Sequence, residues 1–203
     1  MKVAILGGTG PFGKALAVRL VEAGDHVVIG SRDAERAQGI AAEIGTDGAT
    51  NDQAVRGADL VVLAVTAGAA LPTATDLRDA LAAPLLSVVS RIRFEGRRAL
   101  PDDDTHSLAE RVAAEVHVPV AAGLHSLAAG KLAAGRPDED ALVCGDDDEA
   151  KALALELASR LVGGHAIDVG PLACARALEA MTAVIVNANR RYKAHAGLRL
   201  TGL

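Results

Sequence analysis

The stretch KVAILGGTGPFGKALAVRL at residues 2–20 decides the fold. Its apolar run at residues 2–7 predicts a buried strand, and the apolar positions within residues 12–23 have helical spacing. Between the two lies a G-x-G-x-x-G sequence made of Gly8, Thr9, Gly10, Pro11, Phe12 and Gly13. Glycines here let the backbone approach a pyrophosphate, whose charge then rests on the amides of the helix N-terminus. A glycine loop that follows a strand and opens a helix therefore predicts a dinucleotide-binding unit.

Short apolar runs continue to alternate with helical patterns along the rest of the chain. Further strands are expected at residues 26–30, 46–50, 59–65, 84–90, 118–123, 141–145 and 165–170. Helices are expected at residues 33–44, across 111–117, at 148–162 and from Pro171 to about Lys193, with a short one capped by Asn51 or Asp52. This alternation predicts an α/β protein with a Rossmann-like, doubly wound, mainly parallel sheet and a C-terminal helical extension.

The composition narrows the classes of partner. The chain has 203 residues, enough to bury a core without disulfides or metals, and half of them are apolar. Its net charge is -5, and its only aromatic residues are Phe12, Phe94 and Tyr192. Nucleic-acid binders need a basic excess and, for single strands, aromatic rings on which bases stack. No nucleic-acid partner is therefore expected.

Cysteine usage and the N-terminus bear on metals and location. Cys144 and Cys174 have neither metal-ligand nor disulfide spacing, so they are expected to be reduced core residues, and no metal is expected. The N-terminus lacks the longer apolar stretch and cleavage site of a signal peptide. No apolar run approaches the ~18 residues that span a bilayer. A cytoplasmic protein without a membrane partner is expected.

The end of the second strand indicates which dinucleotide is bound. NAD-binding proteins place an acid there to bind the ribose 2′-hydroxyl, whereas this chain has Ser31 and Arg32. An acid would repel a 2′-phosphate, but a hydroxyl and a guanidinium can both donate hydrogen bonds to it. Thr9 and Arg36 are expected to add to the same pocket, and Asp33 to cap the following helix and point away. The stretch therefore favours NADP(H) over NAD.

Candidates for acid–base chemistry are few. No Tyr-x-x-x-Lys pair exists, because Tyr192 is followed directly by Lys193. His125 follows the expected strand at 118–123, where parallel sheets bind ligands, so both a functional and a structural role stay open. The other histidines near element ends are interpreted as structural (His26 and His165) or solvated (His106 and His117).

Basic residues gather in two short stretches of this acidic chain. One is a presumed loop with Arg91, Arg93, Arg97 and Arg98, and the other is the C-terminal segment with Arg190, Arg191, Lys193 and Arg199. Such clusters fit an anion site beyond the NADP phosphate, but two solvated surfaces explain them equally well.

Four stretches carry a resemblance to a known family: MKVAILGGTGPFGKALAVRLVEAGDHVVIGSRD, VCGDDDEAK, IDVGPLACARALEAMT and NRRYKAHAGLRLTGL. They resemble the NADPH-dependent coenzyme F-420 reductases, or F-420:NADP oxidoreductases, essentially from end to end. The resemblance implies direct hydride exchange between NADP(H) and a deazaflavin co-substrate, a small molecule. The cofactors then carry the chemistry and the protein supplies proximity and orientation, so no catalytic side chain is needed.

The resemblance also implies roles for individual residues. Thr9, Ser31 and Arg32 would hold the 2′-phosphate, and Ala64 and Val65 would lie near the nicotinamide or its ribose. His125, Thr182, Gly197 and Leu198 would border the deazaflavin, and the arginine clusters would face its phosphate and oligoglutamate tail. Residues 1–170 would form the NADP-binding Rossmann-like domain, and residues 171–203 a helix and tail that complete the substrate cleft. A homodimer is expected through the resemblance alone.

The chain departs from the family pattern at two places beside the expected cleft. Thr66-Ala67-Gly68 replaces a Pro-Trp-like pair, and RIRFEGRR at 91–98 replaces a more apolar run. Two alternatives therefore stay open. One is an NADPH-dependent reductase of flavin, ferric chelates or imines on the same scaffold. The other is a non-catalytic NADP(H)-sensing protein.

Overall fold

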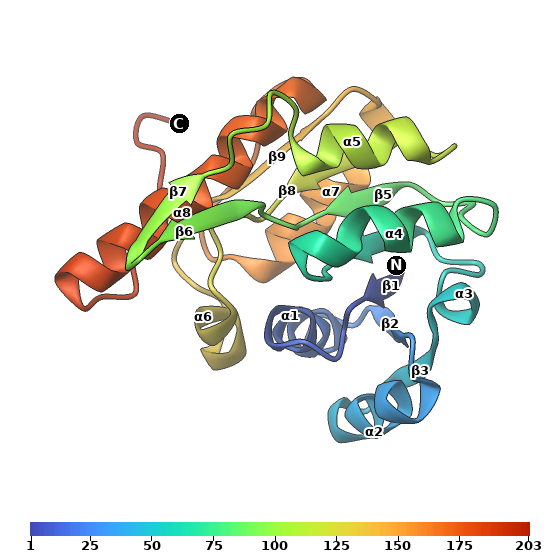
Figure 1. Ribbon diagram of the computed structural model, residues 1–203. Coiled ribbons are helices and arrows are strands. Elements are labelled where there is room, and N and C mark those ends of the chain that lie inside the picture. The colour runs from blue at the N-terminus through green and yellow to red at the C-terminus, as the bar shows by residue number, and fades with distance from the viewer.

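A computed structural model describes residues 1–203, which build an eight-stranded sheet with helices on both faces (Figure 1). The strand order is β10-β9-β8-β5-β4-β1-β2-β3. The strands are β1 Lys2–Leu6, β2 His26–Ser31, β3 Asp47–Thr50, β4 Leu60–Leu63, β5 Leu85–Ser87, β8 Val120–Gly123, β9 Ala141–Gly145 and β10 Ala166–Asp168. Every neighbouring pair is parallel except β8 and β9. The expected mainly parallel, doubly wound sheet is confirmed.

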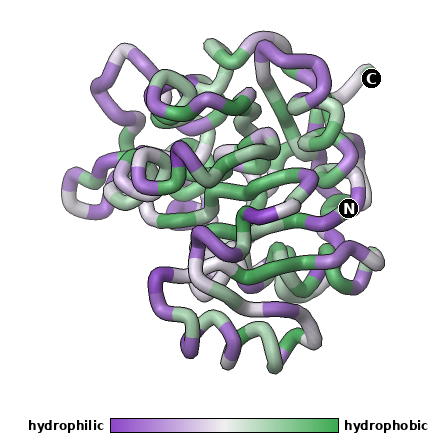
Figure 2. The backbone as a smooth tube through the Cα atoms, turned by 90° about the vertical axis from the view of Figure 1, so that its right-hand side faces the viewer, coloured by the Kyte–Doolittle hydropathy of each residue, from purple (hydrophilic) through white to green (hydrophobic).

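Helices cover both faces because the inner strands of the sheet bury side chains on both sides. They are α1 Pro11–Glu22, α2 Ala34–Ile44, α3 Asn51–Ala54, α4 Ala67–Leu77, α5 Leu108–Glu115, α6 Ala129–Ala134, α7 Asp148–Leu161, the 3-10 turn η1 Leu172–Cys174 and α8 Ala175–Tyr192. One apolar core joins α1, α2, α6 and α7 to the sheet, and a second joins α3, α4, α5 and the start of α8 to the opposite face. Alternate residues of β1 divide between the two, as the period of a strand requires. The hydrophobic stretches accordingly meet in the middle of the molecule (Figure 2).

The sequence pattern misses four elements and misplaces one cap. It gives no sign of α4, whose small residues and internal Pro72 weaken the helical period, nor of the six-residue α6. The presumed loop at 91–98 forms part of an antiparallel hairpin of β6 (Ile92–Glu95) and β7 (Arg98–Pro101). The N-cap of α3 is Thr50 rather than Asn51 or Asp52. No helix of the protein is both long and apolar enough to cross a membrane.

The reversed strand β9 shapes one edge of the sheet. Because β9 is antiparallel to β8, its amino end lies beside the carboxyl end of β8, with Gly123 opposite Val143. The residues that precede β9 therefore share an edge with the carboxyl ends of β1, β2, β4, β5 and β8, which are mutually parallel. Ligands of such sheets bind at that edge.

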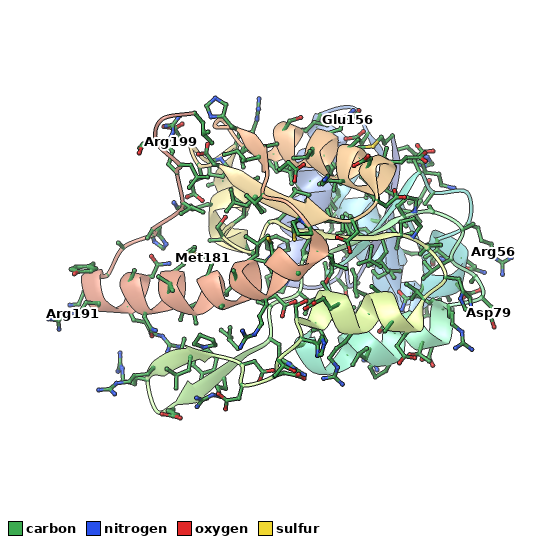
Figure 3. All side chains as sticks on the ribbon, turned by 90° about the horizontal axis from the view of Figure 1, so that it is seen from above. Arg56, Asp79, Glu156, Met181, Arg191 and Arg199 are labelled. Carbon is green, nitrogen blue, oxygen red and sulfur yellow. The ribbon has the colours of Figure 1, made fainter.

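Helix α8 and the β6–β7 hairpin form an arm that extends beyond the sheet (Figures 1 and 3). The first turns of α8 belong to the second core through Ala175 and Leu178. Further along, Asn187 pairs with the backbone of Ala99, accepting from its amide at 2.9 Å and donating to its carbonyl at 2.7 Å. The hairpin therefore follows the outer half of α8.

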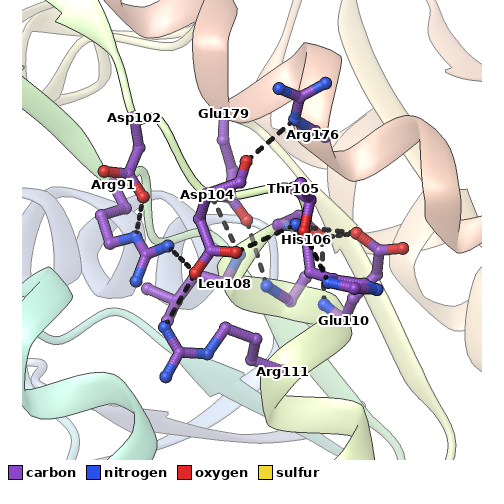
Figure 4. A network of polar contacts seen from close by, with 12 residues as sticks. Arg91, Asp102, Asp104, Thr105, His106, Leu108, Glu110, Arg111, Arg176 and Glu179 are labelled. Atoms are coloured by element: carbon purple, nitrogen blue, oxygen red, sulfur yellow. Dashed lines mark hydrogen bonds and ion pairs between the residues drawn. The ribbon is translucent and has the colours of Figure 1, made fainter.

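A polar network anchors the base of this arm (Figure 4). Arg91 forms ion pairs with Asp102 and with Asp104, the latter at 2.6 Å, and a hydrogen bond from Arg91 lowers the pKa of Asp104 to about 2. The acidic residues Asp102–Asp104 precede α5, but none of them is its N-cap. Ser107 is the N-cap of α5 instead, because its hydroxyl accepts from the Glu110 amide.

The buried carboxylate of Glu179 joins α8 to α5. It accepts hydrogen bonds from the amides of Leu108 and Ala109, each at 3.1 Å. Burial raises the pKa of Glu179, against the opposing effect of these hydrogen bonds. The folded protein therefore binds this proton more tightly than the unfolded chain does.

This linkage predicts a pH-dependent effect of Glu179→Gln. Wild-type stability should fall as pH rises from the ordinary carboxyl pKa through the raised one, whereas glutamine does not titrate. The variant starts with a deficit of about 1 kcal/mol from its lost hydrogen bond and should recover part of it as pH rises above the ordinary carboxyl pKa of about 4. Urea unfolding at a series of pH values measures the difference, and parallel profiles would contradict the assignment.

Candidate functional site

The candidate site is a cleft at the carboxyl ends of β1, β2 and β4. The strand order reverses direction between β1 and β4, and dinucleotides bind in the crevice at such a switch point. The cleft has a volume of about 220 Å³. Its lining consists of Gly7, Thr9, Gly10, Ser31, Arg32, Arg36, Asn51, Ala64, Val65, Thr66, Ala69 and Thr73. A neighbouring pocket of about 300 Å³ shares Ser31, Arg32, Asn51 and Thr73 and extends the cleft toward α3 and α4.

The glycine loop closes tightly on the end of β4. Gly7 has a φ of +85°, and a Cβ there would lie 2.6 Å from the carbonyl oxygen of Ala64. A Cβ at Gly13 would lie 2.6 Å from the carbonyl oxygen of Gly7, so helix α1 can begin against the loop only with glycine at that position. Gly10, by contrast, meets nothing nearer than 3.4 Å and faces the cleft. The loop thus leaves room for a phosphate beside the N-terminal amides of α1.

The other residues of the glycine motif support the loop from the side away from the cleft. Gly8 lies beneath the side chain of Ile29, Pro11 is the first residue of α1, and Phe12 packs against the first core. None of these three, nor Gly13, is among the residues that line the cleft.

The structure brings the expected 2′-phosphate residues together. Ser31, Arg32, Arg36 and Thr9 all line the cleft, and neither guanidinium has a carboxylate within ion-pair distance. Asp33 caps α2 by accepting from the Arg36 amide at 3.1 Å, which confirms its expected role. The Ser31 hydroxyl oxygen accepts from the Asp33 amide at 3.2 Å, so its proton stays available for a ligand. Two unpaired cations beside a free hydroxyl suit a phosphate.

Several residues that line the cleft were not predicted from the sequence. The Oδ1 atom of Asn51 is buried without a hydrogen-bond partner, against Gly30 at the end of β2. An orphaned buried oxygen beside an open cleft fits a donor supplied by a ligand. Ala69 and Thr73 come from α4, which the sequence did not reveal, whereas Thr66, the N-cap of α4, belongs to the segment 66–68 that was expected beside the cleft. For Asn51, the one available signal in the sequence was its position as a polar residue directly after the strand expected at 46–50.

A second polar cluster lies at the ends of β5 and β8. The Ser90 hydroxyl is 2.6 Å from the Thr182 hydroxyl, which donates to the His125 carbonyl at 2.9 Å. Because the Thr182 proton is used in that bond, Ser90 must be the donor to Thr182. Leu124, directly before His125, has a φ of +65°, a conformation that costs a leucine about 1–2 kcal/mol. The structure therefore joins His125 and Thr182 across 57 positions of sequence, with Ser90 as an unforeseen third member.

His125 offers a neutral, uncommitted imidazole. Its residue exposure is 8%, and neither ring nitrogen has a hydrogen-bond partner. Burial lowers the pKa of His125 to about 4, with the nearby Val89 carbonyl acting weakly in the other direction. The ring is therefore neutral at pH 7, with one donor and one acceptor free. The neighbouring Ser126 hydroxyl is also buried and unpaired.

The C-terminal tail returns to the edge where ligands bind. Leu198 accepts from the Asp140 amide at 2.8 Å, and the Asp140 carboxylate accepts from the Leu200 amide at 2.7 Å. Asp140 precedes β9, so the reversed strand is what places Leu198 on this edge. Gly197 lies against the Glu139 carboxyl group so closely that any side chain would collide with it. A side chain at position 197 would therefore require the carboxyl group of Glu139, the end of a flexible side chain, to move.

The basic residues of the two clusters differ in whether they form ion pairs. Arg91 and Arg93 are paired with acids of the hairpin and of the loop that follows it, and Arg199 forms an ion pair with Asp138 at 2.8 Å. These three are not free to form the expected basic rim. No group of three or more His, Cys, Asp or Glu residues is placed to hold a metal ion.

A Rossmann-type sheet with an NADP-type cleft defines a dinucleotide-binding protein, and comparison with known proteins narrows the class. A family model described as coenzyme F420-dependent NADP oxidoreductase matches residues 2–90. The F420-dependent NADP reductase of Methanothermobacter thermautotrophicus is 36% identical and aligns over 100% of this chain and 96% of its own. That of Methanocaldococcus jannaschii is 33% identical over 100% and 99%. A crystal structure of a candidate F420-dependent NADP reductase from Arthrobacter sp. FB24 superposes with a TM-score of 0.87, at 26% identity and 99% coverage of both chains. The chain belongs to the F420-dependent NADP reductase family.

The cleft predicts a selective effect of Arg32→Glu. A charge-assisted contact is worth about 1.5–3 kcal/mol, so reversing the charge should weaken NADPH binding about tenfold or more. NADH lacks the 2′-phosphate, and its affinity should change little. Fluorescence titration with both nucleotides measures the two constants, with Arg191→Glu, at an exposed arginine in the last turn of α8, as the matched control. Equal losses for NADPH and NADH would show that Arg32 does not contact the phosphate.

Proposed function

We propose that this protein transfers a hydride between NADP(H) and the deazaflavin coenzyme F-420. The observation that carries the proposal is the meeting of two ligand-ready regions on one sheet edge. One is the cleft with Arg32 and Arg36, and the other is the cluster of Ser90, Thr182 and His125. Membership of the family supports the reaction, and the two neighbouring regions support the proposed positions of the two coenzymes.

The NADP(H) molecule is assigned to the cleft. Its pyrophosphate would lie on the glycine loop at Gly10 and the N-terminus of α1. Its 2′-phosphate would lie between Ser31, Arg32 and Arg36, whose polar groups have no acidic partner. The nicotinamide end would reach Ala64 and Val65, where β4 ends.

The deazaflavin ring is assigned to the adjoining cluster. The neutral His125 ring can serve a carbonyl oxygen or an N–H of the ligand with its free nitrogens. Two hydrogen bonds, from Ser90 to Thr182 and from Thr182 to the backbone carbonyl of His125, fix the position of His125. Leu198 would close the site from the tail.

The chemistry belongs to the bound coenzymes: a hydride from NADPH reduces the oxidised deazaflavin together with one proton from water. The protein contributes position, and effective molarity from good orientation can supply several kcal/mol of the barrier. It also supplies cations that are fixed before the ligand arrives.

Two rivals remain for the same scaffold. A reductase of flavin, ferric chelates or imines would act on those compounds and leave the deazaflavin oxidised. A non-catalytic NADP(H) sensor would bind NADPH and reduce nothing. The relatives that align over the entire chain are named F420-dependent NADP reductases, and they favour neither rival.

A direct assay separates the three. The protein is mixed with NADPH and oxidised coenzyme F-420, and the deazaflavin absorbance is followed; we expect bleaching. Parallel reactions with free flavin, ferric citrate and a cyclic imine should be far slower. Absence of bleaching, with NADPH binding intact, would overturn the proposed function.

We further propose that α8 pairs with a second copy of the chain. Met181, Ile185 and Ala188 share one helix face, are partly exposed and belong to neither core, and Val184 beside them is 59% exposed. Apolar faces of this kind commonly mark interfaces. Sedimentation should give a dimer for the wild type and a monomer for Ile185→Asp. A monomeric wild type would contradict this.

A further inference from the structure

A second pocket adjoins the part of the cleft that is assigned to the 2′-phosphate. It has a volume of about 300 Å³ and is lined by Ser31, Arg32, Thr50, Asn51, Asp52, Thr73, Asp76 and Leu77. The pocket lies between α3 and the second half of α4. Figure 3 shows Arg56 and Asp79, which lie just beyond these two helices in the chain, at one end of the molecule. We call this space the side pocket.

The covalent structure of NADP(H) limits what can occupy the side pocket. The 2′-phosphate and the adenine base are attached to neighbouring carbons of one ribose. With the phosphate beside Ser31 and Arg32, the base must lie in a space next to these two residues, and both of them line the side pocket. The nicotinamide end of the molecule extends along the cleft toward Ala64 and Val65 instead. The side pocket is therefore the space that remains for adenine.

The cleft and the side pocket differ in charge. The lining of the cleft includes Arg32 and Arg36 and no acid. The lining of the side pocket includes Asp52 and Asp76, with Arg32 as its only basic residue. Carboxylates repel a phosphate but accept hydrogen bonds from an amino group. The two spaces together suit a ligand that is anionic at one point and presents an N–H donor beside it.

Of the two acids, Asp76 is the one whose carboxylate is available to a ligand. Asp52 accepts from the Thr50 hydroxyl at 2.6 Å and forms an ion pair with Arg56 at 3.3 Å. Asp76 takes part in no hydrogen bond and no ion pair, and it is exposed. It follows Thr73 by three positions on α4, so the two side chains lie on one face of that helix. Because Thr73 lines both spaces, Asp76 is placed on the side pocket's share of this face.

Three other residues of the side pocket suit a planar base on a ribose. The guanidinium of Arg32 can stack on an aromatic ring while its N–H groups contact a phosphate. Leu77 supplies apolar surface. Asn51, whose buried Oδ1 atom has no hydrogen-bond partner, lines both spaces and would accept from a ribose hydroxyl.

We propose that Asp76 makes the enzyme specific for adenine by accepting a hydrogen bond from the exocyclic amino group of the base in the side pocket. This inference rests on the assignment of NADP(H) to the cleft in the proposed function, and it adds a selection of the base. Hypoxanthine carries a carbonyl oxygen in place of the amino group. That oxygen would face the Asp76 carboxylate as a second acceptor, so a dinucleotide with hypoxanthine should bind more weakly.

The test compares NADP with its hypoxanthine analogue, which differs only at this position of the base. Their affinities are measured by titration calorimetry without coenzyme F-420. We expect the wild type to bind NADP roughly threefold to tenfold more tightly than the analogue. Asp76→Ala should weaken NADP binding by a similar factor and bring the ratio of the two affinities close to one. Asp76→Asn should bind the analogue more tightly than the wild type does, because its amide can donate to the carbonyl oxygen.

The matched control is Asp79→Asn, at an exposed acid just beyond α4 that lines neither space. It removes the same charge and should leave the ratio of the two affinities unchanged. Equal affinities of the wild type for both dinucleotides, or the same ratio in Asp76→Asn and Asp79→Asn, would overturn the role of Asp76. Bleaching of coenzyme F-420 by NADPH is followed in a separate assay. A protein that bleaches the deazaflavin but does not distinguish the two bases would therefore contradict this inference alone.

Discussion

The approach of the glycine loop to the end of β4 is the constraint on which the rest of the site depends. At Gly7 the two backbones are so close that a single methyl group would lie 2.6 Å from a carbonyl oxygen. This contact fixes where α1 begins, and the N-terminus of α1 then faces the space left between β1 and β4. The cleft exists because no side chain occupies that space. Everything else in the NADP region, from Ser31 to Thr73, lines an opening that this contact creates.

The second half of the site depends on the reversal of β9. A parallel β9 would carry Asp140 and the tail bound to it to the opposite edge of the sheet. The antiparallel strand keeps Leu198 on the edge that also presents Ala64, His125 and Thr182. Helix α8 contributes along its length, since its first turns complete a core, Thr182 lies near its middle and its outer half supports the hairpin.

The sequence predicts most of the sheet because each strand is an apolar run bounded by polar or glycine residues. It predicts the NADP pocket because the glycine loop and Ser31-Arg32 stand at fixed positions in a repeating strand–helix unit. It fails at α4, where alanine, threonine and Pro72 give no clear period, and at the hairpin, where alternating arginines were taken for a loop. Because of these two failures, the sequence did not indicate Ala69, Thr73 or the surroundings of Ser90. The ion pairs could not be predicted from the sequence either, because Asp102 and Asp104 contact Arg91 only in the tertiary fold.

The central claim is that the protein holds two rings in contact so that hydride passes directly between them. The most direct measurement uses NADPH that carries deuterium at C4 of the nicotinamide and follows the label into the deazaflavin by mass spectrometry in ordinary water. A hydrogen bound to the ring carbon does not exchange with water, so direct transfer predicts one deuterium retained in the reduced coenzyme, from one face of the nicotinamide only. Loss of the label to water, or equal transfer from both faces, would contradict the account.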